Sequence, residues 1–225
     1  MSGLDPPTDG AVLSKEMSAR AYYAQGPAPQ ARFELVDRDS PSRPAVEERI
    51  RRGFARHFGA RISAFMPYLL NYEDAMVTGV LGFRPAAEEP LYLEAYLERP
   101  VEQLIGNLVR SPVSRADIVE VGQFVIDDPA GAAAMFNRLV PLLRDRGHAW
   151  IAFTATRSIR RLLEGAGLRG LVIATASEDC VRRAPDAWGS YYARQPQVVV
   201  GKLNDPGGAW CAARRNCGRV LVAVD

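Results

Sequence analysis

A short apolar segment with a carboxylate at its centre most constrains the fold of this chain. Residues 118–126 (IVEVGQFVI) have the branched apolar density of a strand that is buried on both faces. Burying ionised Glu120 there costs several kcal/mol unless the carboxylate is paired, hydrogen-bonded or protonated. In a strand of period two, Glu120, Gly122 and Phe124 would share one face, which predicts open space beside Glu120 over the glycine. A carboxylate beside such a gap is typical of a ligand site.

The same segment begins a strand-helix-strand-helix unit. An Ala-rich helix follows Pro129 and extends to about residue 144, a second strand covers residues 148–154, and Thr156 caps a helix that ends at Gly167. Such a unit predicts a parallel strand pair with a right-handed crossover. Ligands usually bind at the carboxyl ends of such strands.

The remaining segments supply further strands and two helices. Hydrophobic alternation predicts strands at residues 31–36, 68–72, 76–84, 171–174 and 197–203. Helical periodicity predicts helices at about residues 45–58 and 100–109, with Glu47 and Glu48 in the first turn of the former. We therefore expect an α/β (α+β) fold: a mixed twisted sheet of about seven strands with helices on both faces.

One domain accounts for most of the chain. Residues 31–204 hold the predicted core, whereas residues 1–30 are rich in Pro, Gly, Ala and Ser without periodicity and are expected to form a disordered arm. Residues 205–225 are expected to form a tail with a possible edge strand at residues 219–224.

Composition argues against several function classes. The formal net charge is only +2, with 28 Lys and Arg against 26 Asp and Glu, and no basic stripe interleaved with aromatics indicates nucleic-acid binding. Three cysteines are too few and too widely spaced for a disulfide framework or a paired zinc site, and we expect no metal. No secretory pattern and no apolar run of about 18 residues is present, which predicts a cytoplasmic protein without integral membrane association.

The order of the predicted elements resembles that of the Gcn5-related N-acyltransferase (GNAT) fold. In that family the fourth and fifth strands splay apart, and the pantetheine arm of an acyl thioester lies between them. The resemblance implies a splay between strands 118–126 and 148–154. It also implies acyl-coenzyme A or an acyl-phosphopantetheine on an acyl carrier protein as co-substrate, with no tightly bound cofactor.

Five short motifs are together similar to the thermostable hemolysin family. They fall in the expected order over roughly residues 32 to 203. They are GFRPA at 82–86, LYLEAYL at 91–97, IVEVG at 118–122, FTAT at 153–156 and WGSYY at 188–192.

A more distant resemblance is to the acyl-homoserine-lactone synthases. Arg84 after an apolar strand, and Glu120 with Gln123 and Phe124, match the strand that binds the acyl chain and the amine in those enzymes. The chain departs from them at Gln123, where they have Arg, and lacks their acidic pair after the first helix. A homoserine-lactone product is therefore not implied.

These resemblances imply N-acyl transfer from a thioester to an amine or amino acid, in bacterial specialised-metabolite or signal biosynthesis. Glu120 is the candidate base; the structural alternative is an ion pair with a buried arginine such as Arg84. Arg84 can instead hold an acceptor carboxylate, or lie at the surface at a strand end. Tyr191 and Tyr192 can protonate the departing thiolate, or close the core beside Trp188.

Other candidate substrate-binding residues lie along the two strands. These are Gly122, Gln123, Phe124, Phe153, Thr154, Thr156 and Trp188. Thr154 offers a hydroxyl to the pantetheine, whereas Thr156 is expected to act as a helix cap.

Charge bears on the identity of the donor. Asp127, Asp128 and Pro129 stand where most coenzyme A users of this fold bind the diphosphate, so an acyl carrier protein is favoured as partner. Arg157, Arg160 and Arg161 can receive its acidic surface or form a solvated helix face. Two alternative functions stay open: a hemolysin-like membrane-active protein, and a catalytically inactive thioester-binding module.

Overall fold

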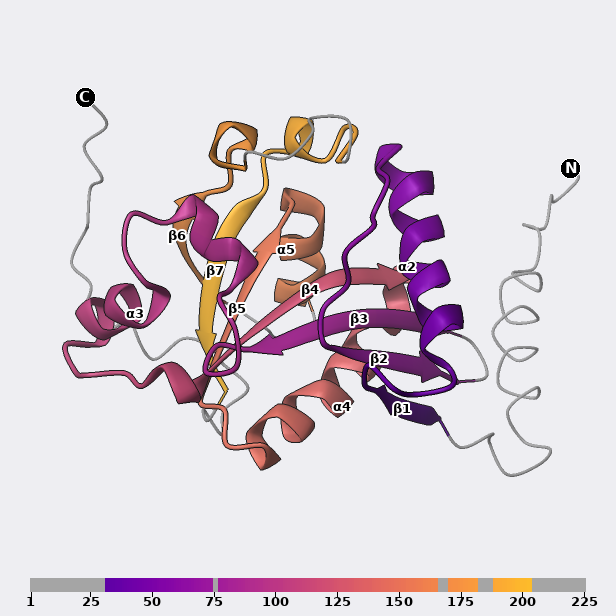
Figure 1. Ribbon diagram of the computed structural model, residues 1–225, viewed down its shortest axis with the longest axis horizontal. Coiled ribbons are helices and arrows are strands. Elements are labelled where there is room, and N and C mark those ends of the chain that lie inside the picture. Colours follow the sequence, from indigo (N-terminus) through magenta and orange to yellow (C-terminus); the bar gives the residue numbers. More distant parts are fainter. Residues whose placement is uncertain (1–30, 75–76, 166–169, 182–187, 204–225) are drawn as a thin grey trace, which may run out of the picture.

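The computed structural model of this protein describes residues 31–74, 77–165, 170–181 and 188–203 (Figure 1). The predictions for the arm at residues 1–30 and the tail at residues 205–225 lie outside the described residues.

One mixed sheet of seven strands forms the centre of the molecule (Figure 1). Its strands are β1 (Arg32–Val36), β2 (Tyr68–Glu73), β3 (Thr78–Pro85), β4 (Ile118–Ile126), β5 (Trp150–Ala155), β6 (Leu171–Thr175) and β7 (Gln197–Lys202). Their order in the sheet is β1-β2-β3-β4-β5-β7-β6; β4 and β5 are parallel, and every other neighbouring pair is antiparallel. The predicted α/β architecture and the strand count are confirmed.

Helices cover both faces of the sheet, as predicted. They are α2 (Arg43–Phe58), α3 (Val101–Val109), α4 (Ala132–Asp145) and α5 (Arg157–Gly165), with a short 3-10 helix, η1 (Tyr92–Tyr96). Apolar residues of α4 and α5 pack with one face of the sheet. Those of α2 pack with β1, β2 and β3 on the other face, and those of η1 and α3 pack there with β4, β5 and β7. Three hydrophobic clusters result.

Helix α2 begins earlier than its periodicity suggested. Arg43 is buried, and its guanidinium donates to the carbonyls of Met66 and Pro67 at 2.8 Å each, which fixes the helix start to the loop before β2. Because Pro44 suits the first turn, the helix includes it, and Glu47 falls beyond the first turn rather than within it. There it accepts from Arg43 Nε at 2.7 Å.

Strands β4 and β5 diverge after a short paired stretch (Figure 1). They pair only from Ile118 and Trp150 to Val121 and Phe153, although β4 continues to Ile126. The expected splay between the two strands is therefore present at their carboxyl ends.

A β-bulge at Gln123 accompanies the divergence. The pairing of β4 with β3 passes from Gly82 and Gly122 to Val80 and Val125, so that two residues of β4 oppose one of β3, and Gln123 has a positive φ of 53°. An extra residue reverses the side-chain alternation of everything that follows it.

This reversal corrects the prediction that alternate residues of β4 share one face throughout. Glu120 and Gly122 lie on the η1 and α2 side, but Phe124 packs on Phe136 of α4, with ring centroids 5.5 Å apart. Val125 takes the α2 side instead: a Cβ atom on Gly53 of α2 would lie 2.4 Å from its Cγ1.

Candidate active site

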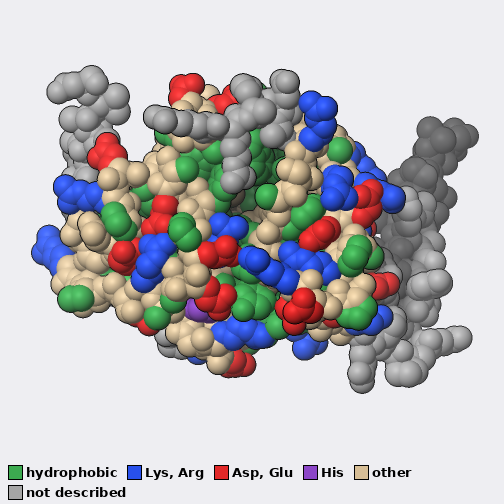
Figure 2. Space-filling model, in the orientation of Figure 1, with side chains coloured by type: hydrophobic (Ala, Val, Ile, Leu, Met, Phe, Trp, Pro, Cys, Tyr) green, Lys and Arg blue, Asp and Glu red, His purple; other side chains and the backbone are tan. Residues whose placement is uncertain are grey.

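A cavity of about 500 Å³ opens where β4 and β5 diverge. Residues of β4, β5, α2, α5, the segment 61–66 and the turn at residues 188–194 line it. Figure 2 shows a recess with hydrophobic side chains above the centre of the molecule, between α2 and β7. On the rest of that face acidic and basic side chains are interspersed, without a continuous basic stripe.

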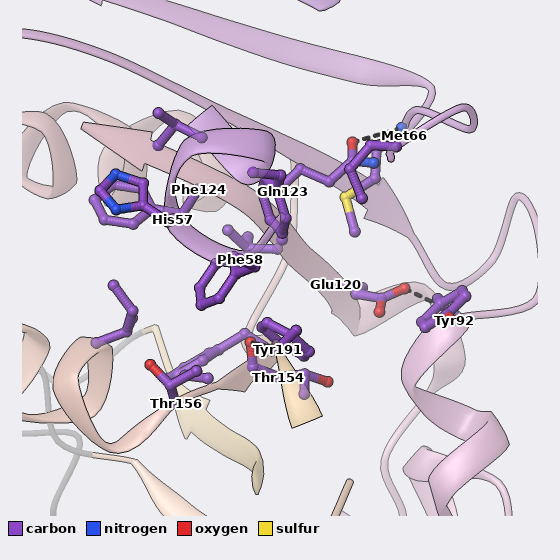
Figure 3. Close-up of a pocket in the computed structure, with 18 of the residues that line it drawn as sticks. His57, Phe58, Met66, Tyr92, Glu120, Gln123, Phe124, Thr154, Thr156 and Tyr191 are labelled. Carbon is purple, nitrogen blue, oxygen red and sulfur yellow. Dashed lines mark hydrogen bonds between the residues drawn. The ribbon is translucent and has the colours of Figure 1, made fainter. Parts of the chain in front are cut away.

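Glu120 lies on the wall of this cavity and is only 3% exposed. Its Oε2 accepts the backbone N–H of Tyr92 at 2.8 Å (Figure 3), and its Oε1 accepts that of Leu93 at 3.0 Å. Both donors belong to the first turn of η1, where free N–H groups attract an anion. Glu120 therefore tethers η1 to the sheet and has its carboxylate orientation fixed.

Burial raises the pKa of Glu120 to about 7. The N–H groups of Tyr92 and Leu93 and the positive charge of Arg84 lower this pKa, but they do not offset the loss of solvation. A carboxyl group with a pKa near neutrality exchanges protons readily at physiological pH.

Arg84 stands directly opposite Glu120 on β3 and also lines the cavity. Its Nη1 donates to the carbonyl of Pro90 at 3.0 Å, and its Nε lies 3.3 Å from Glu89 Oε1. The salt-bridge partner of Arg84 is thus Glu89, whereas Glu120 is held by backbone N–H groups. The expected structural alternative, an ion pair between Arg84 and Glu120, is not the observed arrangement in the described part of the chain.

An ion-pair network around Arg115 holds η1 in place. Arg115 donates from both terminal nitrogens to Glu94 at 2.6 Å, from Nη1 to Glu102 at 2.9 Å and from Nε to the carbonyl of Ala86 at 2.8 Å. Glu94 lies within η1. The network therefore holds the helix whose N–H groups hold Glu120.

Tyr191 lines the cavity within an aromatic wall. Its ring centroid lies 5.2 Å from that of Phe58 and 5.5 Å from that of Trp188, and its hydroxyl donates to the carbonyl of Thr154 at 3.4 Å. Burial raises the pKa of Tyr191, which keeps the phenol neutral. Trp188 also lines the cavity.

Tyr192 does not itself line the cavity, but it contacts a lining tyrosine that the sequence reasoning did not single out. Its hydroxyl lies 2.7 Å from that of Tyr96, and Tyr96 of η1 lines the cavity. Tyr92 of η1 lines it too. Both tyrosines belong to the LYLEAYL motif at residues 91–97, which indicated only the family resemblance. The same motif could have indicated them as candidate site residues.

Gln123 supports the cavity wall through two hydrogen bonds. Its Oε1 accepts the N–H of Met66 at 3.0 Å (Figure 3), and its Nε2 donates to the carbonyl of Ala64 at 2.7 Å. Met66 in turn fills the space over Gly122, since a Cβ atom there would lie 2.8 Å from Met66 Cε. Met66 therefore occupies the position directly over Gly122 where open space was predicted, although Gly122 itself still lines the cavity beside Glu120.

The remaining predicted residues lie where β4 and β5 have parted. Phe124, Phe153, Thr154 and Thr156 all line the cavity. The hydroxyl of Thr154 is buried and has no hydrogen-bond partner within the described residues. Thr156 directly precedes α5, and its carbonyl accepts the N–H of Arg160 at 3.0 Å, which fits the expected cap position.

The turn that carries Trp188 and Tyr191 docks closely on α2. Gly189 has a φ of +52°, a Cβ atom there would lie 2.0 Å from the carbonyl oxygen of Phe58, and the N–H of Ser190 donates to that oxygen at 2.8 Å. We expect Gly189→Ala to lower the free energy of unfolding by about 2–3 kcal/mol, because left-handed strain and a backbone clash combine. Urea unfolding measures this loss.

Gly59→Ala is the matched control for that variant. Gly59 has a φ of +66° but nothing within 4 Å of a Cβ atom, so only the left-handed strain of about 1 kcal/mol applies. Equal losses in the two variants would show that the close approach to Phe58 is unimportant.

Residues 31–74, 77–165, 170–181 and 188–203 contain neither a metal-binding cluster nor a membrane-spanning helix. No group of three or more His, Cys, Asp or Glu side chains there is arranged to hold a metal ion. Within the same residues, no helix has the length and apolar character needed to span a membrane.

Comparison with known proteins agrees with this architecture. An N-acyl amino acid synthase from uncultured soil microbes, FeeM, superposes with a TM-score of 0.53 at 12% identity, over 79% of this chain and 92% of its own. The acyl-homoserine-lactone synthase LasI superposes with a TM-score of 0.51 at 12% identity, over 78% of this chain and 91% of its own. At such identities the likeness concerns the fold, which is that of GNAT-like acyltransferases.

A comparison of sequences identifies the family of the chain. No curated protein sequence matches the chain significantly. The sequence model of the thermostable hemolysin family matches residues 36–206, as the five motifs predicted. The chain therefore belongs to the thermostable hemolysin family.

Proposed function

We propose that this protein is an N-acyltransferase that moves an acyl group from a pantetheine thioester to an amine or amino acid. The observation that carries the proposal is the position of Glu120, a buried carboxylate on the wall of a cavity that opens where β4 and β5 part. The fold shared with FeeM and LasI supports it.

Glu120 serves as the base in this proposal. The amine nitrogen attacks the thioester carbonyl, Glu120 takes the amine proton directly or through one water, and the carbon–sulfur bond breaks to release a thiolate that becomes protonated. Each carboxylate oxygen accepts one N–H and keeps a second lone pair for the substrate proton. A pKa of about 7 suits this task near neutral pH.

Arg84 and the tyrosines complete the proposed site. Arg84 lies across the strand pair from Glu120 and can bind the carboxylate of an amino-acid acceptor. Tyr191 keeps its proton because burial raises its pKa, so its hydroxyl is suited to donate a hydrogen bond to the developing charge on oxygen or sulfur. The long bond from Tyr191 to Thr154 is one that a substrate can replace. Tyr192 acts through its hydrogen bond to Tyr96.

An acyl carrier protein is the donor that the charges favour over coenzyme A. At the start of α4, Asp128 accepts the N–H of Ala130 at 2.9 Å through its side chain and the N–H of Gly131 at 3.0 Å through its carbonyl. Those amides are already satisfied, and the Asp128 carboxylate repels a diphosphate. Arg157 and Arg161 are exposed on α5 beside the cavity and can meet an acidic carrier.

The test is product formation from defined thioesters. Purified protein is incubated with acyl-carrier-protein and coenzyme A thioesters and a panel of amines and amino acids, and amides are identified by mass spectrometry while thiol release is followed. We expect an amide that exceeds the Glu120→Gln background. Absence of any amide, together with red-cell lysis that survives Glu120→Gln, would instead favour a lytic protein. Tight thioester binding without turnover would favour an inactive binding module.

A further inference from the structure

The cavity continues past Glu120 into the hydrophobic core under α4 and α5. Building on the proposed acyl transfer, we infer that its donor substrates are thioesters with unbranched hydrocarbon tails of about eight to twelve carbons, rather than acetyl thioesters. The inference rests on how polar and apolar residues are distributed along the cavity wall.

Ionisable side chains lie toward the α2 and η1 side of the cavity. Glu120 faces η1, and Arg84 stands opposite it. His57 belongs to the last turn of α2, Arg61 follows that helix, and Arg194 ends the turn at residues 188–194. Acyl transfer and any anionic substrate group therefore belong on this side.

Apolar side chains form the α4 and α5 side. The sheet and α4 contribute Phe124, Phe136, Ile151 and Phe153, and α5 contributes Ile159, Leu162 and Leu163. All seven belong to, or pack against, the hydrophobic cluster beneath these helices. We call this apolar side of the cavity the apolar branch. Ile151 is only 1% exposed and Leu163 only 4%, yet both line the cavity, so the apolar branch reaches the interior of the fold.

Local structure explains why the branch exists. The bulge at Gln123 turns Phe124 toward α4, and the pairing of β4 with β5 has already ended at Val121 and Phe153. Ile159 and Leu163 are one helical turn apart, so α5 presents an apolar stripe to the resulting gap. The gap between the strands thus joins the polar side to an apolar interior.

The size of the cavity sets the length of the tail. A volume of about 500 Å³ corresponds to about seventeen groups of the size of a water molecule, at about 30 Å³ each. The thioester and the acceptor amine take about a quarter to a half of this space, which leaves room for about eight to twelve carbons. Each methylene buried there should tighten binding about fourfold, whereas an acetyl group leaves the apolar branch empty.

Binding of unreactive analogues tests this without requiring turnover. S-alkyl pantetheine thioethers with tails of two to sixteen carbons are titrated by calorimetry into the full-length protein. We expect the Kd to fall about fourfold for each added methylene until the tail reaches about eight to twelve carbons, and then to level off. A Kd that is the same from two carbons upward would overturn the inference.

Two substitutions narrow the apolar branch, and one is a matched control. Leu163→Phe and Ile159→Phe add bulk on the α5 stripe and should end the fall in Kd at tails at least two carbons shorter. Leu142→Phe makes the same kind of change in the same hydrophobic cluster, at a residue that does not line the cavity. The control should keep the wild-type profile; an equal shift in all three variants would count against the assignment. Either narrowing variant suffices if the other does not fold.

The two proposals fail in different ways. A chain-length profile for binding without turnover on any acceptor would sustain the tail inference and refute the proposed transfer. Turnover that is fastest with acetyl thioesters would sustain the transfer and refute the inference.

Discussion

Replacing Glu120 by Gln should lower kcat/KM by about 10²- to 10⁴-fold, the range attributed to a positioned acid or base. Gln keeps the size of the side chain and can still accept one of the two N–H groups of η1, but it cannot take a proton from the amine. Circular dichroism checks that the variant folds. An unchanged kcat/KM in a folded variant would leave Glu120 only its structural role of tethering η1.

The pH profile separates these two roles. Burial raises the pKa of Glu120 to about 7, and catalysis needs the deprotonated form. We therefore expect kcat/KM of the wild-type protein to rise with pH and to level off above about 7, apart from any later rise due to the acceptor amine itself. This rise of kcat/KM up to about pH 7 should be missing in Glu120→Gln. If the rise persists in the variant, another group is the base.

Replacing Arg115 by Met should clearly lower the stability of the protein. The substitution removes the hydrogen bonds to Glu94, Glu102 and the carbonyl of Ala86, and leaves a half-buried carboxylate at η1. With side-chain exposures of 31% for Arg115 and 19% for Glu94, we expect a loss of about 2–3 kcal/mol in the free energy of unfolding. The corresponding fall in melting temperature is about 4–12 °C.

An exposed ion pair of similar geometry provides the control. Arg52 Nε lies 2.7 Å from Glu48 Oε1, but the Arg52 side chain is 74% exposed, so Arg52→Met should leave the free energy of unfolding almost unchanged. Comparable losses of unfolding free energy in Arg52→Met and Arg115→Met would contradict the importance assigned to the ion-pair network of Arg115.

Acidification should act on the same network. Burial alone would raise the pKa of Glu94, but its hydrogen bonds with Arg115 and with the N–H groups of Val101 and Leu91 lower it below the ordinary value near 4.5. The network therefore stabilises the folded state fully above about pH 4.5. This stabilisation is lost as the pH falls through the lowered pKa of Glu94. Arg115→Met should remove most of this dependence, which denaturation at a series of pH values measures.

Much of the architecture could be predicted because it depends on local pattern. The density and alternation of apolar residues predicted seven strands close to their observed bounds, and the strand-helix-strand-helix order predicted the parallel pair of β4 and β5. Glu120 stood out because a lone carboxylate in an apolar strand needs a partner. These conclusions used only neighbours along the chain.

What could not be predicted depends on contacts between distant segments. The bulge at Gln123 follows from pairing with β3 and from hydrogen bonds to residues 64 and 66, so the period of β4 alone gave the wrong face for Phe124. The true partners of Glu120 are backbone N–H groups of η1, which no side-chain pattern marks. Met66 covers Gly122 from a segment more than 50 residues away in sequence.

Residues of all three hydrophobic clusters line the cavity. Where these side chains face the cavity instead of one another, they make fewer dispersion contacts than close-packed core residues do. An acyl tail bound in the cavity would then pack as part of the hydrophobic core, and it would leave the core on dissociation. By mass action, a ligand at 100 times its Kd adds about 2.7 kcal/mol to the folded state, so occupancy should be visible as a raised thermal midpoint even where no reaction occurs.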